Sequence, residues 1–119
     1  PKVFGADAND SRIVLLAVGS TWVEIRDTKN NEVLLTRVLY FGDRYRAPNR
    51  TGLVLMTGNA GDLQITVDGQ SVPSIGPIGS VRRNVPLDPA ALREGRAVQA
   101  LIGLQQQPYA PPKPDVTTP

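Results

Sequence analysis

The sequence predicts an all-β domain: an antiparallel β-sandwich of Ig-like or Greek-key type, with about seven or eight short strands and a proline-rich C-terminal tail. Three observations predict this fold class. Short apolar runs rich in β-branched residues recur along the chain, and turn dipeptides such as Asp68-Gly69 separate them. No long helical pattern alternates with these runs, which argues against a parallel βαβ sheet.

The stretch from Gly52 to Gly69 carries the clearest strand pattern. Leu53–Thr57 and Leu63–Val67 each alternate between two faces. The glycine-rich segment Gly58–Gly61 between them predicts a tight reversal, so we expect the two runs to form a hairpin. Asp68-Gly69 predicts a second, two-residue hairpin turn, because both residues tolerate positive φ.

Strands are expected on the N-terminal side of this hairpin. Ile13–Val18 is a continuous apolar run typical of a strand buried on both faces or in a sandwich core. Thr21–Asp27 alternates, with Val23 and Ile25 facing inward and Trp22, Glu24 and Arg26 sharing the other face. Thr28–Asn31 predicts a turn.

The next run, Glu32–Phe41, is too apolar for a strand with one wet face. We expect Val33, Leu34 or Leu35, and Val38 or Leu39 in the core, with a β-bulge near Thr36-Arg37. Gly42-Asp43 turns the chain into a short strand, Arg44–Pro48, with Tyr45 inward and the arginines outward. Pro48 ends that strand or places it at an edge.

The C-terminal part begins with a short return strand, Gln70–Pro73. A last strand follows at Ser80–Leu87, where Arg83 interrupts an apolar series and indicates either a rim position or a bulge after Val81. Asp88-Pro89 predicts a helix start, with an acidic N-cap and proline at the first helical position. We expect a linker end at 1–11, the β-sandwich domain at 12–96, and a tail at 97–119 that is weakly helical and then proline-rich and flexible.

Composition excludes several classes of chemistry. The 119 residues contain no histidine and no cysteine, which removes the usual general base, metal ligands and thiolate nucleophile. The net charge is only +2, so we expect no nucleic-acid binding through this domain. No run is long and apolar enough to span a bilayer, no signal peptide heads the chain, and no cofactor is expected.

Catalytic motifs are also missing. Gly69–Val72 lacks the closing glycine of a nucleophile elbow, and Gly58–Gly61 has no following lysine or helix to cradle phosphate. Glu24 and Asp62 are the carboxylates considered for two-carboxylate hydrolysis, but Glu24 is better explained as half of a surface pair with Arg26. The sequence therefore predicts a protein that is not an enzyme.

Two groups of residues are candidates for binding. Arg44, Arg46 and Arg50, with Arg82 and Arg83, could form a basic face, although scattered solvated arginines are the commoner case. Trp22 and Tyr45 could form a platform for a sugar or peptide, although core or cross-strand packing is commoner for both. The candidate partner-binding surface is Trp22, Glu24, Arg26, Arg44, Tyr45 and Arg46.

Four stretches, taken in order, resemble the C-terminal domain of RodZ, the bacterial cytoskeleton protein. They are TWVEIRD (21–27), RVLYFGDRYRAP (37–48), GLVLMTGNAGDLQITVDGQSVP (52–73) and GPIGSVRRNVPLDP (76–89). The resemblance covers roughly residues 12–95. It implies a larger parent with a cytoplasmic helix-turn-helix domain, one membrane span, a linker and this domain in the periplasm. It transfers no catalytic or ligand residues.

The resemblance implies a role in rod-shape maintenance. The leading hypothesis is a non-enzymatic periplasmic interaction module of a bitopic inner-membrane protein, which helps couple the actin-like cytoskeleton to peptidoglycan elongation. Its partners would be wall-elongation membrane proteins or a second copy, and it would meet the membrane only through a transmembrane segment outside this stretch. The alternatives are a peptidoglycan-binding module that uses exposed aromatic residues, and a two-carboxylate hydrolase.

Overall fold

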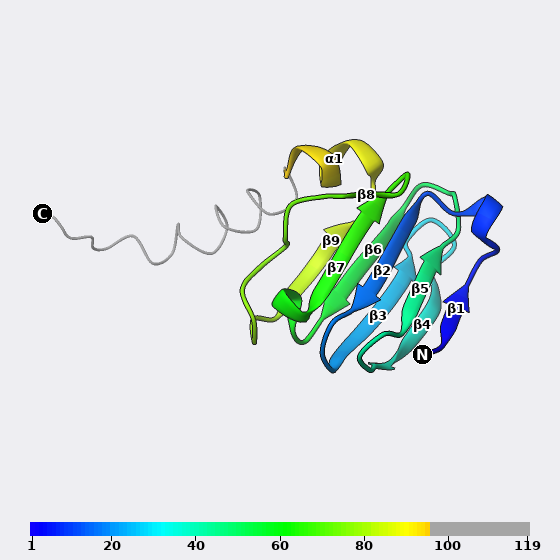
Figure 1. The fold of residues 1–119 in the computed structure, drawn as a ribbon. Helices are drawn as coiled ribbons and strands as arrows, with labels where there is room; N and C mark the ends of the chain where they lie inside the picture. The colour runs from blue at the N-terminus through cyan, green and yellow to red at the C-terminus, as the bar shows by residue number, and fades with distance from the viewer. Residues whose placement is uncertain (96–119) are drawn as a thin grey trace, which may run out of the picture.

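The computed structural model describes residues 1–95, which form two β-sheets packed face to face with a short helix at one end (Figure 1). All but one of the strand pairs are antiparallel. This confirms the all-β, antiparallel sandwich. The predicted tail at 97–119, expected to be weakly helical and then proline-rich, lies outside the described residues.

Nine strands are present within residues 1–95, slightly more than expected. One sheet has five strands in the order β1-β5-β2-β7-β8, and the other has four in the order β4-β3-β6-β9. A helix, α1, follows the last strand. In chain order the elements are β1 (Val3–Gly5), β2 (Ile13–Ala17), β3 (Thr21–Asp27), β4 (Glu32–Leu39), β5 (Arg44–Ala47), β6 (Leu53–Thr57), β7 (Leu63–Val67), β8 (Gln70–Ser71), β9 (Arg82–Pro86) and α1 (Pro89–Glu94).

The core lies between the two sheets, and strand alternation fills it. Every second side chain is buried in β2, β3, β5, β6 and β7, because successive residues of a strand point to opposite faces. Val23, Ile25 and Leu55 of the four-stranded sheet are fully buried, as is Leu15 of the five-stranded sheet. The inward residues expected for β3 are therefore confirmed, and its outward residues lie on the opposite face of the same sheet.

The expected hairpin between β6 and β7 is wrong. β6 pairs with β3 and β9, whereas β7 pairs with β2 and β8 in the other sheet. The glycine-rich segment that follows Thr57 therefore carries the chain from one sheet to the other, and Ala60–Asp62 forms a 3-10 turn on the way. Turn residues show that the chain bends but do not show whether the flanking strands pair with each other.

The loop before β9 holds this crossing segment in place. The Ala60 N–H donates to the Ser80 carbonyl (2.8 Å), and the Gly61 N–H donates to the Pro77 carbonyl (3.0 Å). A β-carbon built on Gly61 would lie 2.1 Å from the backbone nitrogen of Ile78. Glycine is therefore required at 61 because another backbone passes too close for any side chain.

Two buried threonines connect the crossing to β3. The hydroxyl oxygens of Thr21 and Thr57 lie 2.7 Å apart, and both side chains are buried. The Thr21 hydroxyl also lies 3.2 Å from the Asn59 carbonyl, to which it donates. These bonds satisfy hydroxyl groups that would otherwise be costly to bury.

The bulge in β4 lies at Leu34 and not near Thr36-Arg37. Consecutive residues of β3 pair with Leu35 and Val33, which leaves Leu34 unpaired. The register shift turns Val33, expected in the core, toward solvent at 45% exposure. We expected either Val38 or Leu39 in the core, and Leu39, at the end of the strand, is fully buried.

The N-terminal residues belong to the folded unit. Val3–Gly5, expected within the end of a linker, pairs in parallel with β5 and forms one edge of the five-stranded sheet. The Arg37 guanidinium carbon lies 4.1 Å from the centre of the Phe4 ring, a cation–π contact between β4 and β1. This contact connects edge strands of opposite sheets, so β1 helps to close one side of the sandwich.

The second predicted hairpin and the helix start are confirmed. Asp68 (φ 51°) and Gly69 (φ 83°) connect β7 to β8, with positive φ at both central positions of the turn. The Asp88 carboxylate caps α1 by accepting the Ala91 N–H at 2.9 Å. Gly95 ends the helix in the left-handed conformation.

Asp68 also connects α1 to the sheet. Its carboxylate accepts two hydrogen bonds from Arg12, each of 2.9 Å, and forms an ion pair with Arg93 of α1. These hydrogen bonds, Arg12 first, lower the pKa of Asp68 to about 2. The β7–β8 turn, the start of β2 and the helix therefore meet at one carboxylate.

Replacing Gly61 by alanine should destabilise the domain by about 3 kcal/mol, because the new methyl group must displace the Ile78 backbone. Gly58→Ala is the matched control: its β-carbon would meet only the Trp22 β-carbon, at 3.8 Å, so a change below about 0.5 kcal/mol is expected. Urea unfolding measures both values. Equal stabilities for the two variants would contradict the inter-sheet crossing.

Asp68 should titrate near pH 2 in the folded domain, below its ordinary value of 3.8. Its contribution to stability is present above the unfolded pKa and is lost as the pH falls through about 2. Arg12→Gln should raise the folded pKa toward 3.8, Arg93→Gln should raise it less, and Arg46→Gln should leave it unchanged. NMR titration of the side-chain carboxyl measures this, and a wild-type midpoint near 3.8 would contradict the cluster.

Candidate functional site

The outer face of the four-stranded sheet is the candidate site. Trp22, Glu24 and Arg26 lie together on this face because β3 buries the residues between them. In the register of the sheet, Glu24 pairs with Met56 and Arg26 pairs with Val54 of β6. The three predicted residues of β3 therefore share their face with two apolar residues from the adjacent strand.

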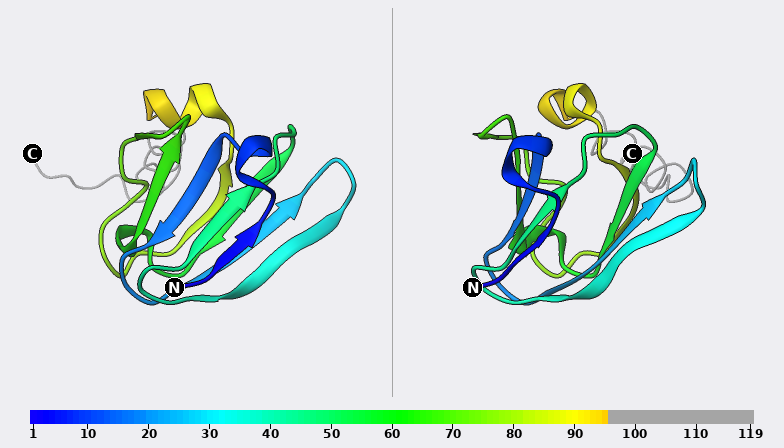
Figure 2. Two further views of the ribbon diagram at one scale, coloured as in Figure 1. Left: turned by 45° about the vertical axis from the view of Figure 1, so that its right-hand side comes forward. Right: turned by 90° about the vertical axis from the view of Figure 1, so that its right-hand side faces the viewer.

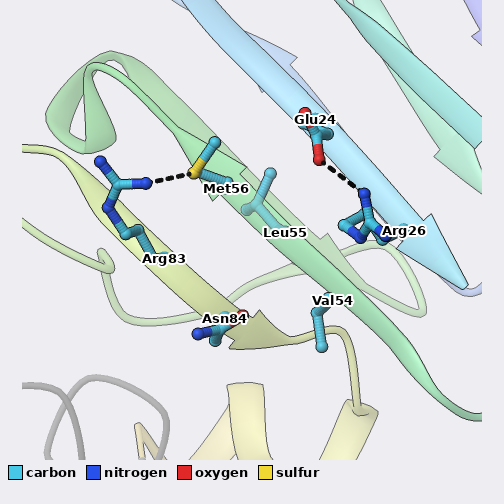
Figure 3. Close-up of a pocket in the computed structure, with 7 residues that line it drawn as sticks. All are labelled: Glu24, Arg26, Val54, Leu55, Met56, Arg83 and Asn84. Atoms are coloured by element: carbon cyan, nitrogen blue, oxygen red, sulfur yellow. Dashed lines mark hydrogen bonds and ion pairs between the residues drawn. The ribbon is translucent and has the colours of Figure 1, made fainter. Parts of the chain in front are cut away.

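A shallow hollow of about 150 Å³ lies on this face between β3, β6 and β9 (Figure 3). Val54 and Met56 contribute apolar surface to it. Glu24 and Arg26 line one side, with the Arg26 Nη1 and the Glu24 Oε2 3.4 Å apart. This contact confirms the expected surface pair, which carries little stabilisation because both groups meet solvent.

Arg83 lines the other side of the hollow because of a β-bulge in β9. Leu55 pairs with Val85 and Thr57 pairs with Arg82, so two residues of β9, Arg83 and Asn84, lie opposite Met56 alone. Asn84 adopts positive φ (54°) within this bulge. The bulge explains how an arginine fits within the apolar series of the last strand, and it was one of the two expected alternatives.

The bulged arginine contacts the apolar part of the hollow. Its Nη1 lies 3.2 Å from the Met56 sulfur, a weak hydrogen bond to a thioether. The guanidinium is exposed, so its remaining donors face solvent. Arg83 therefore combines packing against Met56 with free hydrogen-bonding capacity.

Trp22 continues the face toward the start of β3. The side chain is half-buried, and Val38 of β4 is its cross-strand partner. Gly58, whose N–H donates to the Trp22 carbonyl at 2.9 Å, adds no side chain beside it. The indole consequently keeps exposed surface next to an uncovered stretch of backbone.

A buried carboxylate fixes the far end of β3. Asp27 is completely buried and accepts hydrogen bonds from Asn30 (2.8 Å to the side chain), the Lys29 N–H (3.0 Å) and Arg50 (2.9 Å). These bonds, led by the one from the Asn30 side chain, lower the pKa of Asp27. The Asp27 carboxylate thus stabilises the β3–β4 turn. Arg50 is paired with this carboxylate, so its role is structural.

The other half of the predicted surface lies elsewhere. Arg44, Tyr45 and Arg46 belong to β5, in the five-stranded sheet. Tyr45 is only 2% exposed, and burial raises the pKa of its phenol. The alternation that turns the two arginines outward necessarily turns Tyr45 inward, so Tyr45 cannot form a surface platform with Trp22.

The structure also separates the proposed basic face. Arg44 and Arg46 lie on the five-stranded sheet, and Arg50 binds Asp27. Arg82 donates from its Nε to the Ile75 carbonyl (3.1 Å), which holds the loop before β9. Only Arg83 of this group lies on the candidate face.

The site offers little for two-carboxylate catalysis. Glu24 is the one acidic side chain of residues 1–95 that lines the hollow, and Asp62 lies in the inter-sheet crossing, bonded to the Asn59 amide at 2.8 Å. The described part of the chain contains no cluster of acidic side chains that could hold a metal ion. No helix within that part is long and apolar enough to cross a membrane.

Sequence reasoning missed Val54, Met56 and Arg83 as members of this face. The alternation of β6 did place Val54 and Met56 on its second face, but their position beside Glu24 depends on the pairing of β3 with β6. The sequence pattern did not predict that pairing, because we expected β6 to pair with β7 in a hairpin. Arg83 required the location of the bulge, for which the interrupted apolar series was the available signal.

A family model described as the RodZ C-terminal domain matches residues 14–86 of the chain. The match spans β2 to β9 and includes every strand that forms the candidate face. No curated protein and no solved structure matches the chain significantly.

Proposed function

The chain belongs to the RodZ C-terminal domain family, and we propose that it is a non-enzymatic module that binds wall-elongation membrane proteins through the outer face of the four-stranded sheet. The family is one of structural and interaction domains connected with cell shape. The proposal extends this role: the domain acts in the periplasm, as part of a bitopic inner-membrane protein that couples the actin-like cytoskeleton to peptidoglycan synthesis. The alternative to binding another protein is self-association, in which two copies of the chain meet through the same face.

The composition of the face carries this proposal. The face joins the apolar surface of Val54 and Met56 to charged groups of both signs, and Trp22 extends it toward the start of β3. Tryptophan, methionine and arginine are the residue types enriched where proteins bind proteins, and a few such residues usually supply most of the binding energy. Glu24 and Arg83 lie on opposite sides of the hollow and carry opposite charges. Charge complementarity with these two groups would fix the orientation of a bound partner.

The position of the face on a packed sheet supports the same function. Val23, Ile25 and Leu55 lie directly behind it and are fully buried. The backbone under the site therefore cannot shift without disturbing the core, so a partner would meet a preformed surface.

Trp22→Ala should weaken partner binding roughly thirtyfold, and Arg83→Gln should weaken it about fivefold, as expected for a large aromatic anchor and a flanking charge. The measurement is a quantitative pull-down of wall-elongation membrane proteins by the 119-residue chain. Ile78→Ala removes a 76% exposed side chain of the loop before β9 that does not line the hollow, and Arg44→Gln removes a charge from the other sheet. Both should bind as the wild type does.

Thermal melting separates a lost contact from a lost fold in this experiment. If folded Trp22→Ala and Arg83→Gln variants capture the same partners at wild-type levels, the outer face of the four-stranded sheet is not the binding surface. If Arg44→Gln alone lowers capture, the contact lies on the five-stranded sheet.

A peptidoglycan-binding module is the second candidate function. The observation that favours it is Trp22 beside Gly58, where exposed indole surface adjoins backbone without a side chain. Sugars commonly stack on such aromatic surfaces. Tyr45 cannot contribute because it is buried, so this function would depend on Trp22 with polar neighbours such as Glu24 and Thr36.

Titration of isotopically labelled domain with soluble muropeptides tests this second function. Glycan binding requires chemical-shift changes that are centred on Trp22 and disappear in Trp22→Ala. Because we propose protein binding as the main role, the expected result is no saturable shift at millimolar muropeptide. Saturable shifts at Trp22 would replace the protein-binding proposal with the glycan-binding one.

A further inference from the structure

The end of the sandwich opposite α1 carries a second, chemically different surface. The β4–β5 turn, the β2–β3 connection and the N-terminal residues meet there (Figures 1 and 2). Two aromatic side chains are exposed at this turn, Tyr40 at 57% and Phe41 at 76%. Val3 nearby is 52% exposed, so this end presents apolar groups that the core does not use.

The turn presents Phe41 in a fixed position. The Asp43 N–H donates to the Tyr40 carbonyl (2.8 Å), and Gly42 has φ of 89°, which gives a type II turn with Phe41 at its second position. The buried Asp43 carboxylate accepts the backbone N–H groups of Tyr40 (3.0 Å) and Lys2 (2.9 Å), and these bonds lower its pKa. Hydrogen bonds on both sides of Phe41 thus fix the turn that presents its side chain to solvent.

The turn is also fastened to the sheet. The Gly42 N–H donates to the Ala17 carbonyl (2.8 Å), and the Ala17 N–H donates to the Asp43 carbonyl (3.0 Å). These two bonds join the turn to the last residue of β2. Exposure of the aromatic residues is therefore a property of the folded domain.

An apolar hollow of about 370 Å³ lies beside the turn. Val3, Leu16, Val18 and Phe41 contribute to its walls, and Arg44 supplies the one charged side chain among the described residues that line it. Within residues 1–95, no acidic side chain lines the hollow. Two carboxylates of this end are occupied: Asp43 by backbone N–H groups, and Asp62, at the β6–β7 crossing, by the Asn59 amide.

Two arginines of β5 next to this hollow are available for an anionic partner. Within the described chain, the side chains of Arg44 and Arg46 form no ion pair, in contrast to Arg12, Arg50 and Arg93. Both point outward from β5 because Tyr45 between them is buried. Arg46 lies about 6.6 Å farther from the turn than Arg44, at roughly 3.3 Å per strand residue.

We propose that this end of the domain, from Phe41 to Arg46, docks on an anionic lipid bilayer. The order of groups fits the interface: aromatic side chains at the tip, then Arg44, then Arg46. Aromatic residues favour the boundary between acyl chains and headgroups, and arginines behind them meet lipid phosphates. The hollow gives apolar surface to the acyl boundary, and its single charged lining side chain, the cationic Arg44, matches a negatively charged partner.

This inference is independent of the proposed protein contact, which uses the outer face of the other sheet. It adds a membrane contact made by the domain itself to the one expected through a transmembrane segment. A domain lying on the bilayer by its β4–β5 turn would leave the part of the candidate face around Arg26 and Val54, at the far end of β3, free for a protein partner.

Co-sedimentation of the 119-residue chain with large unilamellar vesicles tests the proposal. Vesicles of phosphatidylcholine with about 30% phosphatidylglycerol, which gives a negative surface, should bind the chain. Vesicles of phosphatidylcholine alone should bind it at least about tenfold more weakly. Binding to the anionic vesicles should weaken as salt rises from about 50 to about 500 mM, because the charges are screened.

Matched variants identify the surface. Phe41→Ser should lower anionic-vesicle binding by roughly tenfold, whereas Val33→Ser, which removes an apolar side chain that is 45% exposed near the opposite end of β4, should not change it. Arg44→Gln and Arg46→Gln should each lower it about fivefold, with Arg83→Gln as the unchanged control. A double variant, Trp22→Phe with Phe41→Trp, carries its single indole at the turn, and its fluorescence emission should shift to the blue when anionic vesicles are added.

Three outcomes would overturn the proposal. Wild-type chain could fail to bind anionic vesicles, or bind neutral vesicles equally well. Phe41→Ser and Val33→Ser could retain the same affinity while the double variant shows no blue shift. Finally, Phe41→Ser could abolish capture of a protein partner while wild-type chain ignores vesicles, which would assign this end to a protein contact.

Discussion

The passage of the chain from β6 to β7 is the constraint on which the rest of the structure depends. Leu53–Thr57 joins one sheet and Leu63–Val67 joins the other, and the segment between them crosses with Gly61 against the Ile78 backbone. The alternating apolar residues of these two segments then face each other across the core instead of lying side by side. The same crossing leaves β6 free to pair with β3 and β9, and this pairing assembles the candidate face from three strands that are distant in sequence.

Period-2 patterning made much of this fold predictable. It gave the inward faces of β3 and β5 correctly, and turn chemistry gave the Asp68-Gly69 hairpin and the start of α1. The error at Gly58–Gly61 has a physical cause, since a glycine-rich bend serves equally well for a hairpin and for a crossing between sheets. The bulge at Leu34 was misplaced for a related reason: in a run as apolar as β4, either neighbouring side chain can face the core.

The candidate site was predictable only in the part that one strand determines. Trp22, Glu24 and Arg26 follow from the alternation of β3, whereas Met56 and Arg83 join them through non-local pairing. Tyr45 illustrates the opposite case, because its inward direction was predicted and yet excludes it from the surface to which it was assigned. The exposed Phe41 depends on a type II turn whose stabilising partner, Asp43, became evident only from its bonds to the backbone.

The central claim is that the outer face of the four-stranded sheet is the surface that meets other proteins. Photo-crosslinking in living cells tests it most directly, with a crosslinking amino acid placed at Val54 on this face, or at Thr66 on the outer face of the five-stranded sheet. The account predicts crosslinks to wall-elongation membrane proteins from position 54 and none from position 66. Crosslinks to those proteins from position 66 and none from position 54 would contradict it.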